Sequence, residues 1–295
     1  MDHIATLVTK VQEDRAEERL MTLFGDAGLK PSGELRRLSD RAVEADVGSV
    51  GVDEIDAFRK ALSTQSADAA LLPAAARRKR LLVCDMDSTI IEQECLDELA
   101  DFADLKAEIS AITDRAMRGE LNFEEALTNR VAMLKGLPKT AIEECYNSRI
   151  SLTPGARTLV ATMVSQGAKC LLVSGGFTAF TSRVAQAAGF DEHYANTLLD
   201  DGEVLTGNVK DPILGREAKL TRLVEAADAL GIQPFDTLAM GDGANDLAMI
   251  DTAGLGIAFR AKPIVAAGAD AAIDHTDLET ALYYQGFREE EFVTP

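Results

Sequence analysis

The sequence contains no tryptophan, only three histidines and only four cysteines, which are scattered along the chain. No two cysteines form a C-x-x-C pair, and the histidines do not form an H-E-x-x-H motif. These absences exclude the usual sequence patterns of a structural zinc site, a disulfide framework and a zinc protease. We therefore predict a cytoplasmic protein with reduced thiols.

Long apolar runs and basic charge are also scarce. No run approaches the roughly 18 apolar residues that a membrane span requires, and the N-terminus lacks the basic and apolar segments of a signal peptide. The 30 lysines and arginines face 49 acidic residues, which gives a net charge of −19. Such a chain repels phosphate backbones and anionic membranes, so we expect neither nucleic acid nor a membrane as a partner.

The chain is long enough for about two domains, with 295 residues of which 46% are hydrophobic. The segment 71–80, LLPAAARRKR, combines a proline, small residues and a basic cluster, which is typical of a domain boundary. We interpret its end, Arg77–Arg80, as the solvated lead-in to a strand rather than as a nucleic-acid site. The predicted domains are residues 1–76 and 77–295.

The N-terminal residues show a β-α-β-β-α-β pattern, which predicts a small α+β domain of the ferredoxin-like type. The expected strands are 4–10, 35–38, 43–50 and 69–72, and the expected helices are 13–27 and 52–63. This order resembles the ACT regulatory domains. Our hypothesis is that this region binds a small amino acid or mediates formation of a homodimer.

Strands and helices alternate in the second part of the chain. Apolar runs within 80–87, 169–176, 237–246 and 255–259 predict strands, and 155–166, 178–188 and 217–230 predict helices. This alternation indicates an α/β fold with a doubly wound parallel sheet. The almost wholly helical insert at about 93–151 is too long for a simple crossover, so we interpret it as a cap over the sheet edge.

Two aspartates, Asp85 and Asp87, follow the first of these apolar runs. Ligand sites in open α/β sheets form at the carboxyl ends of the strands. Neighbouring carboxylates are costly unless a cation binds them or one stays protonated. Both conditions suit phosphoryl transfer, with one carboxylate as nucleophile, the other as general acid and base, and Mg²⁺ between them. Residues that merely cap the next helix would give a similar pattern.

Two later loops carry related signals. In VSGGF, Ser174 and the backbone N–H groups of Gly175 and Gly176 could hold phosphate oxygens. In MGDGANDLAMI, three oxygen-bearing side chains suit Mg²⁺: Asp242, Asn245 and Asp246. Plain turns use the same residue types.

A single lysine, Lys219, lies between these two loops at the start of a predicted helix. It could reach back to a phosphate, although most lysines in such places only contact water.

The order D-x-D-S-T, S-G-G, a lone Lys and G-D-G-x-N-D resembles the haloacid dehalogenase (HAD) superfamily over about two-thirds of the chain. Within it, DMDSTIIEQE and VSGGF resemble the phosphoserine phosphatases. The resemblance implies that Asp85 is the nucleophile and Asp87 the general acid and base. It also implies an Mg²⁺ ion held by Asp85, Asp242 and the carbonyl of Asp87. The remaining implied roles are phosphate binding by Ser174, Gly175 and Lys219, and support of the metal and phosphate by Asn245 and Asp246. Asn245 also counts among the implied substrate-binding residues.

The resemblance extends into the cap. Glu94 and Arg130 match the residues that bind the amino group and the carboxylate of the substrate, and Phe123 and Met117 match apolar residues that close over it. Without the family match, both charged residues would pass for ordinary helix-surface charges. The implied reaction on this small-molecule substrate is the Mg²⁺-dependent hydrolysis of L-phosphoserine to L-serine and phosphate through an aspartyl-phosphate, the last step of serine biosynthesis.

Three alternatives stay open at this point. The chain could be a phosphotransferase of the same superfamily, or a phosphatase for another small phosphate ester. It could also be a serine-sensing module with vestigial activity, although the intact set of Asp85, Asp87, Lys219 and Asp242 argues against that.

Overall fold

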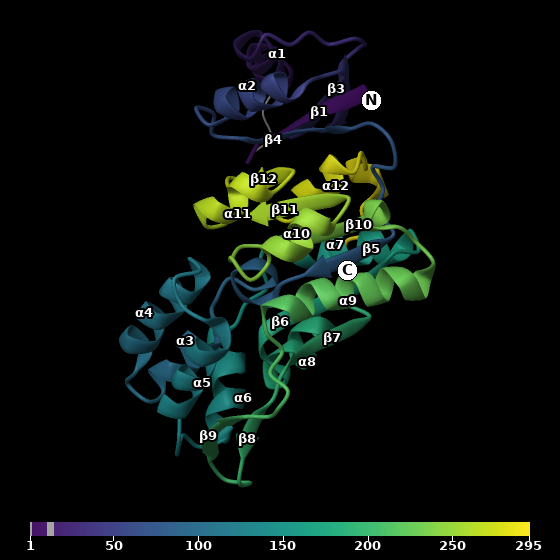
Figure 1. The fold of residues 1–295 in the computed structure, drawn as a ribbon. Coiled ribbons are helices and arrows are strands. Elements are labelled where there is room, and N and C mark those ends of the chain that lie inside the picture. Colours follow the sequence, from purple (N-terminus) through teal and green to yellow (C-terminus); the bar gives the residue numbers. More distant parts are fainter. Residues whose placement is uncertain (1, 11–14) are drawn as a thin grey trace.

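The computed structural model describes residues 2–10 and 15–295, without the side chain of Met117. Figure 1 shows a small N-terminal unit at one end, the large sheet with its covering helices in the middle, and a group of cap helices at the other end. None of the described helices is long and apolar enough to cross a membrane.

The N-terminal unit is an antiparallel sheet in the order β2-β3-β1-β4, with two helices on one face. Its elements are β1 (Asp2–Val8), α1 (Ala16–Ala27), β2 (Arg36–Ser39), β3 (Ala42–Ser49), α2 (Val52–Leu62) and β4 (Asp68–Pro73). Alternate strand residues such as Ala5 and Leu7 form a core with α1 and α2. The predicted ferredoxin-like arrangement is confirmed. The first helix begins at Ala16, and the predicted positions 13 and 14 lie outside the described residues.

The large sheet is parallel throughout, in the order β12-β11-β10-β5-β6-β7. Its strands are β5 (Leu81–Cys84), β6 (Lys169–Phe177), β7 (Glu192–Asn196), β10 (Thr237–Gly241), β11 (Leu255–Phe259) and β12 (Ala271–Ile273). In β5, Leu81 and Val83 pack on one side and Leu82 and Cys84 on the other. A strand that is buried on both faces reads as a continuous apolar run, which is the pattern that predicted it.

Helices cover both faces of this sheet, so the predicted doubly wound fold is confirmed. One face packs against α9 (Arg216–Leu230), α10 (Leu247–Thr252) and α11 (Pro263–Gly268). The other packs against α7 (Ala156–Ser165), α8 (Thr178–Ala188) and α12 (Thr280–Tyr284). The chain leaves β5 for β6 on one side, and β10 pairs with the other side of β5. This reversal places the ends of β5, β6 and β10 side by side, as ligand sites in such sheets require.

The insert after β5 is helical, as predicted, with α3 (Cys95–Asp101), α4 (Lys106–Met117), α5 (Phe123–Met133) and α6 (Thr140–Arg149). A hairpin of β8 (Leu198–Asp200) and β9 (Leu205–Val209) joins it, which the sequence analysis did not predict. The Leu205 N–H donates to the Leu137 carbonyl at 2.9 Å, and its carbonyl accepts from the Gly136 N–H at 2.9 Å. Figure 1 shows the hairpin beside α5 and α6. The cap therefore combines helices with a distant hairpin.

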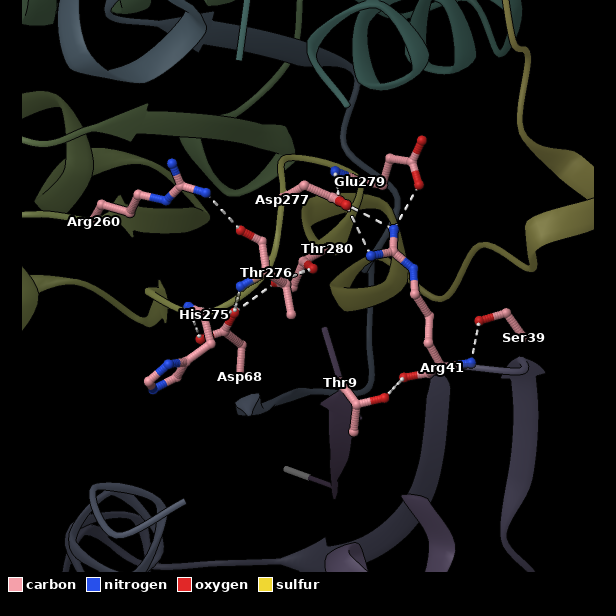
Figure 2. Close-up of polar contacts among 10 residues, drawn as sticks. All are labelled: Thr9, Ser39, Arg41, Asp68, Arg260, His275, Thr276, Asp277, Glu279 and Thr280. Atoms are coloured by element: carbon pink, nitrogen blue, oxygen red, sulfur yellow. Dashed lines mark hydrogen bonds and ion pairs between the residues drawn. The ribbon is translucent and has the colours of Figure 1, made fainter. Parts of the chain in front are cut away.

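The free face of the N-terminal sheet packs against α12, where Val8, Ala42 and Leu72 share an apolar core with Tyr283 and Tyr284. Polar contacts line the same interface (Figure 2). The Asp68 carboxylate accepts hydrogen bonds from the backbone N–H groups of residues 274–276 and from the Thr276 hydroxyl, at 2.6–3.2 Å. Arg41 pairs with Asp277 at 2.9 Å and with Glu279 at 2.6 Å. The two sheets are thus joined by apolar packing and by paired charges.

The basic run at the boundary is only in part the solvated lead-in that we predicted. Lys79 is buried and donates to the Phe235 carbonyl at 2.8 Å. Arg77 is largely buried and pairs with Glu44 at 2.8 Å. Only the two exposed members of the run, such as Arg78, fit the prediction. The prediction failed because this segment runs between two packed sheets, and sequence alone did not show that contact.

Candidate active site

The two neighbouring aspartates lie at the carboxyl end of β5, and both are buried. The Asp85 N–H donates to the Met240 carbonyl at 2.9 Å, which ties the loop after β5 to β10. One Asp85 carboxylate oxygen accepts from the Met86 N–H at 2.7 Å. Ser88 then adopts a left-handed conformation with φ of 54°, and the Cys95 N–H donates to Asp87 at 2.8 Å. The tight turn therefore keeps both carboxylates at the sheet edge.

An acidic cluster with one lysine lies beside them. Asp85, Asp242 and Asp246 each place a carboxylate oxygen within 4.8 Å of the others. The Lys219 ammonium lies 2.7 Å from Asp85 Oδ2 and 2.5 Å from Asp246 Oδ1. The second oxygen of Asp246 accepts from the N–H groups of Asp242 and Gly243, at 3.2 and 3.0 Å. Lys219 and the backbone thus satisfy Asp246, but they leave Asp242 without a comparable partner.

Burial makes the negative charge of this cluster costly. Burial, followed by the charges of Asp246 and Asp85, raises the pKa of Asp242 well above its ordinary value. Burial and then Asp85 raise the pKa of Asp246 to about 7, and the same two causes raise that of Asp87 to about 6. Burial opposes the charge of Lys219, but Asp246 and Asp85 outweigh it and raise its pKa. All four shifts point to a shortage of positive charge.

The cluster fits a divalent cation. Asp242 Oδ1 is buried and has no hydrogen-bond partner among the described residues, and the same holds for Asn245 Oδ1. Leaving such atoms unpaired is costly, and carboxylate and amide oxygens are the ligands that hard cations prefer. An ion at this place would satisfy these atoms and offset the excess negative charge.

The glycine-rich end of β6 closes the other side of the site. Ser174 is fully buried; its hydroxyl donates to Asp87 Oδ2 at 3.2 Å and accepts from the Gly176 N–H at 2.8 Å. A Cβ atom on Gly176 would lie 2.8 Å from Asp87 Oδ2, so only glycine fits there. From β7, the Asn196 amide donates to the Gly175 carbonyl at 2.9 Å and accepts from the Leu214 N–H at 2.6 Å. The loop is therefore held rigidly against the aspartates.

Two opposite charges of the cap face the same place. Glu94 accepts a hydrogen bond from the Ser88 hydroxyl at 2.7 Å. Burial and the charges of Asp87 and Asp242 raise the pKa of Glu94 well above its ordinary value. Arg130 is buried in α5. Burial lowers the pKa of its guanidinium, although the nearby acidic side chains raise it. These two side chains offer one anionic and one cationic group to a bound molecule.

The cap packs against the edge of the sheet. A cavity of about 40 Å³ remains between them, lined by Asp85, Asp87, Glu94, Leu96, Phe123, Leu127, Arg130, Ser174, Gly175, Gly176, Phe177 and Asn245. Phe123 lies directly on the glycine loop, because a Cβ atom on Gly175 would be 2.5 Å from its ring. The ring of Phe123 thus covers part of the site.

Comparison with known proteins agrees with this geometry. The family model of the haloacid dehalogenase-like hydrolases matches residues 82–251, more than half of the chain. A probable phosphoserine phosphatase of Schizosaccharomyces pombe is 38% identical over 97% of this chain and 96% of its own length.

The chain belongs to the phosphoserine phosphatases of the haloacid dehalogenase-like hydrolases.

Solved structures support the same assignment. A HAD family hydrolase of Salmonella enterica serovar Typhi has a TM-score of 0.84 at 30% identity and is matched over 98% of this chain and 99% of its own. A phospho-aspartyl intermediate analogue of phosphoserine phosphatase has a TM-score of 0.67 at 41% identity, over 70% of this chain and 99% of its own. The present phosphatase is therefore a phosphoric monoester hydrolase, and enzymes of this family use a divalent metal.

The structure brings the predicted site residues of this phosphatase together. Asp85, Asp87, Ser174, Gly175, Glu94, Phe123, Arg130 and Asn245 line one cavity. Lys219, Asp242 and Asp246 form the charged cluster that includes Asp85. Met117 ends α4, and its side chain lies outside the described part of the phosphatase. The individual chemical roles remain predictions.

Several residues around the site carry contacts that the sequence did not predict. Asn196 lies on a strand that the polar sequence EHYAN did not reveal. Ser88 belongs to the quoted D-x-D-S-T motif, so its position could have suggested a contact with Glu94. In the cap of the phosphatase, Asp97 and Thr113 contact each other at 2.7 Å, but neither carries a recognisable signal in a helical sequence.

Proposed function

We propose that this phosphatase hydrolyses L-phosphoserine to L-serine and phosphate, with Asp85 as nucleophile and Asp87 as general acid and base. The carrying observation is that these two aspartates line the same cavity as Glu94 and Arg130. Phosphoserine has a phosphate, an ammonium group and a carboxylate. The cavity offers a counterpart for each of them.

The chemistry takes two steps. A carboxylate oxygen of Asp85 attacks phosphorus while the bond from phosphorus to the serine oxygen breaks, and Asp87 gives its proton to that oxygen. Water then attacks the phosphorus of the aspartyl-phosphate, and Asp87 takes the proton of the water. The bond between phosphorus and Asp85 breaks, which releases phosphate and restores both carboxyl groups.

The phosphate and its counter-charges are held by the surrounding residues. Ser174, Gly175 and Lys219 bind the phosphate oxygens, since all three belong to the rigid surroundings of Asp85 and Asp87. Asp85, Asp242 and the carbonyl of Asp87 would hold Mg²⁺, with Asn245 and Asp246 in support; the unpaired oxygen of Asp242 favours this assignment. When bound, Mg²⁺ supplies positive charge that stabilises the transferring phosphoryl group.

Recognition of the amino-acid part rests on the cap. Glu94 binds the ammonium group, because its buried carboxyl lies among other acids and an ammonium group gives it a cationic partner. Arg130 binds the carboxylate through its guanidinium fork. Phe123 closes over the substrate and excludes water.

The test compares phosphate release from L-phosphoserine with release from O-phosphoethanolamine, which has the ammonium group but no carboxylate, each with Mg²⁺ and with a chelator. We expect L-phosphoserine to be strongly preferred and all turnover to depend on the metal. Arg130→Ala should remove the preference and leave turnover of O-phosphoethanolamine nearly intact. Equal turnover of both substrates by the unchanged enzyme would refute the substrate assignment while keeping the aspartyl-phosphate mechanism.

We further propose a domain boundary after residue 76, a catalytic domain over 77–295 with its cap at about 93–151, and a cytoplasmic location. The separate core under α1 and α2 supports the boundary, and the four buried, free cysteines suit a reducing compartment.

The N-terminal domain would bind a small amino acid or form a homodimer, as ACT domains do. Calorimetry of the full chain with L-serine, and sedimentation of the full chain, test these two roles separately.

A further inference from the structure

Side chains of the cap hold Arg130, whose role in binding the substrate carboxylate rests on the proposed function. Arg130 has five guanidinium N–H groups. The Nε group donates to the carbonyl of Ala126 at 3.2 Å, and Nη1 donates to the Thr113 hydroxyl at 2.8 Å. Nη2 has no hydrogen-bond partner among the described residues, and the side chain lines the catalytic cavity. One edge of the fork is thus fixed by the protein and the other is left for a ligand.

Thr113 links Arg130 to a third helix, α3, through a hydrogen bond to Asp97. Its hydroxyl has a single proton, and the nearer acceptor is Asp97 Oδ1 at 2.7 Å, against 3.1 Å for the Ile109 carbonyl. Because Arg130 donates to the same oxygen, the hydroxyl proton is directed to Asp97. The side chains come from α3, α4 and α5, and their exposed fractions are 7% for Asp97, 4% for Thr113 and 6% for Arg130.

We propose that Thr113 and Asp97 are positioning residues that set the orientation of Arg130 for the substrate carboxylate. An arginine side chain has many rotamers, and ordering it has an entropic cost. The cavity also contains the acids Glu94 and Asp87, which attract a loose guanidinium. The chain of contacts from Asp97 through Thr113 holds Arg130 away from them. It thereby keeps the anionic and cationic sides of the amino-acid pocket apart and spares the substrate the cost of ordering the side chain.

The test uses Thr113→Val, which keeps the shape but removes the hydroxyl, and Thr113→Ser, which keeps the hydroxyl. The measured quantity is the ratio of kcat/KM for L-phosphoserine to kcat/KM for O-phosphoethanolamine. We expect Thr113→Val to lower this ratio by about tenfold to a hundredfold, the range of a hydrogen bond to a charged group, mainly through KM. Thr113→Ser should restore most of it. Thr128→Val is the matched control: Thr128 lies exposed on α5 and bonds only a carbonyl of its own helix, so the ratio should stay unchanged.

A mutant cycle separates positioning from general damage to the cap. If Thr113 acts through Arg130, Thr113→Val should not lower the ratio further in an Arg130→Ala background. An equal loss in both backgrounds, or the same loss on both substrates, would overturn the proposal. If Thr113→Val does not fold, Asp97→Asn is measured in the same way with the same expected and contrary outcomes. A wild-type enzyme without preference for L-phosphoserine would instead refute the proposed function, and that result is known before any variant is made.

Discussion

Two groups of acidic side chains in the described part of the chain differ in how their charges are balanced. Between the two sheets, Asp68 accepts from three backbone N–H groups and a hydroxyl, and Arg41 lies between Asp277 and Glu279 (Figure 2). At the catalytic edge, Lys219 is the one lysine that contacts the cluster formed by Asp85, Asp242 and Asp246 within the described chain, and Asp242 Oδ1 has no partner.

Whether a buried carboxylate has all its hydrogen-bond partners within the chain distinguishes a structural use of buried charge from a functional one. A buried carboxylate that is fully hydrogen-bonded can stabilise a fold, whereas a cluster with unsatisfied oxygens costs free energy until something binds. The interface cluster is complete within the chain. In the catalytic cluster, Asp242 Oδ1 has no partner among the described residues, and we propose that a cation completes it. We therefore expect substitutions in the two clusters to act on different measurable quantities, and in one case with opposite sign.

The largest expected effect is on catalysis. Asp85→Asn removes the nucleophile and should lower kcat for L-phosphoserine by at least about 10⁴-fold, the size of effect seen when a catalytic nucleophile is lost. Asp68→Asn, at the structural cluster, should leave kcat within about twofold at temperatures where the protein is folded. Both are measured as phosphate release. Residual turnover by Asp85→Asn above about a hundredth of the wild-type value would contradict the assignment of the nucleophile.

The next effect is stabilisation by metal. Mg²⁺ at 100 times its dissociation constant should raise the free energy of unfolding by about 2.7 kcal/mol, because it binds the folded chain only. A chelator should remove both this increment and the activity. Asp242→Asn should greatly reduce the Mg²⁺-dependent increment, and Asp277→Asn should leave it unchanged. Urea titrations with and without Mg²⁺ measure it, and an increment that survives Asp242→Asn would place the cation elsewhere.

In the absence of metal, an Asp→Asn substitution should change the free energy of unfolding in opposite directions in the two clusters. Asp68→Asn places an amide against backbone donors and should lower the free energy of unfolding by about 2 kcal/mol. Asp242→Asn removes a repelling charge and should raise it by about 1 kcal/mol, as relief of a functional site often does. Urea titration of the two chelated variants tests this. Destabilisation by both substitutions would mean that the catalytic cluster is balanced in the absence of metal.

The same distinction explains what could be predicted from the sequence. The runs that became β5, β6 and β10 are apolar on both faces, and their ends carry glycine and acidic residues, so both fold and site motifs were visible. The edge strand β7 and the hairpin of β8 and β9 are short and half-exposed, so their patterns are weak. The roles of Asp68, Thr113 and Asn196 depend on partners distant in sequence. No local pattern contains such information.

The smallest effect concerns the basic run between the two sheets, where neighbouring residues differ most in burial. Arg78 pairs with Glu291 at 2.7 Å on the exposed surface, so Arg78→Ala should change the free energy of unfolding by no more than about 0.5 kcal/mol. Lys79 is buried, donates to the Phe235 carbonyl and lies 4.6 Å from the centre of its ring. Lys79→Met keeps the apolar stem but leaves that carbonyl unpaired, which should cost about 1 kcal/mol. Both residues are basic and adjacent, so an equal loss in free energy of unfolding for the two substitutions would mean that the run acts through its net charge. A larger loss for Lys79→Met would show that the hydrogen-bond partner of each buried group decides its contribution.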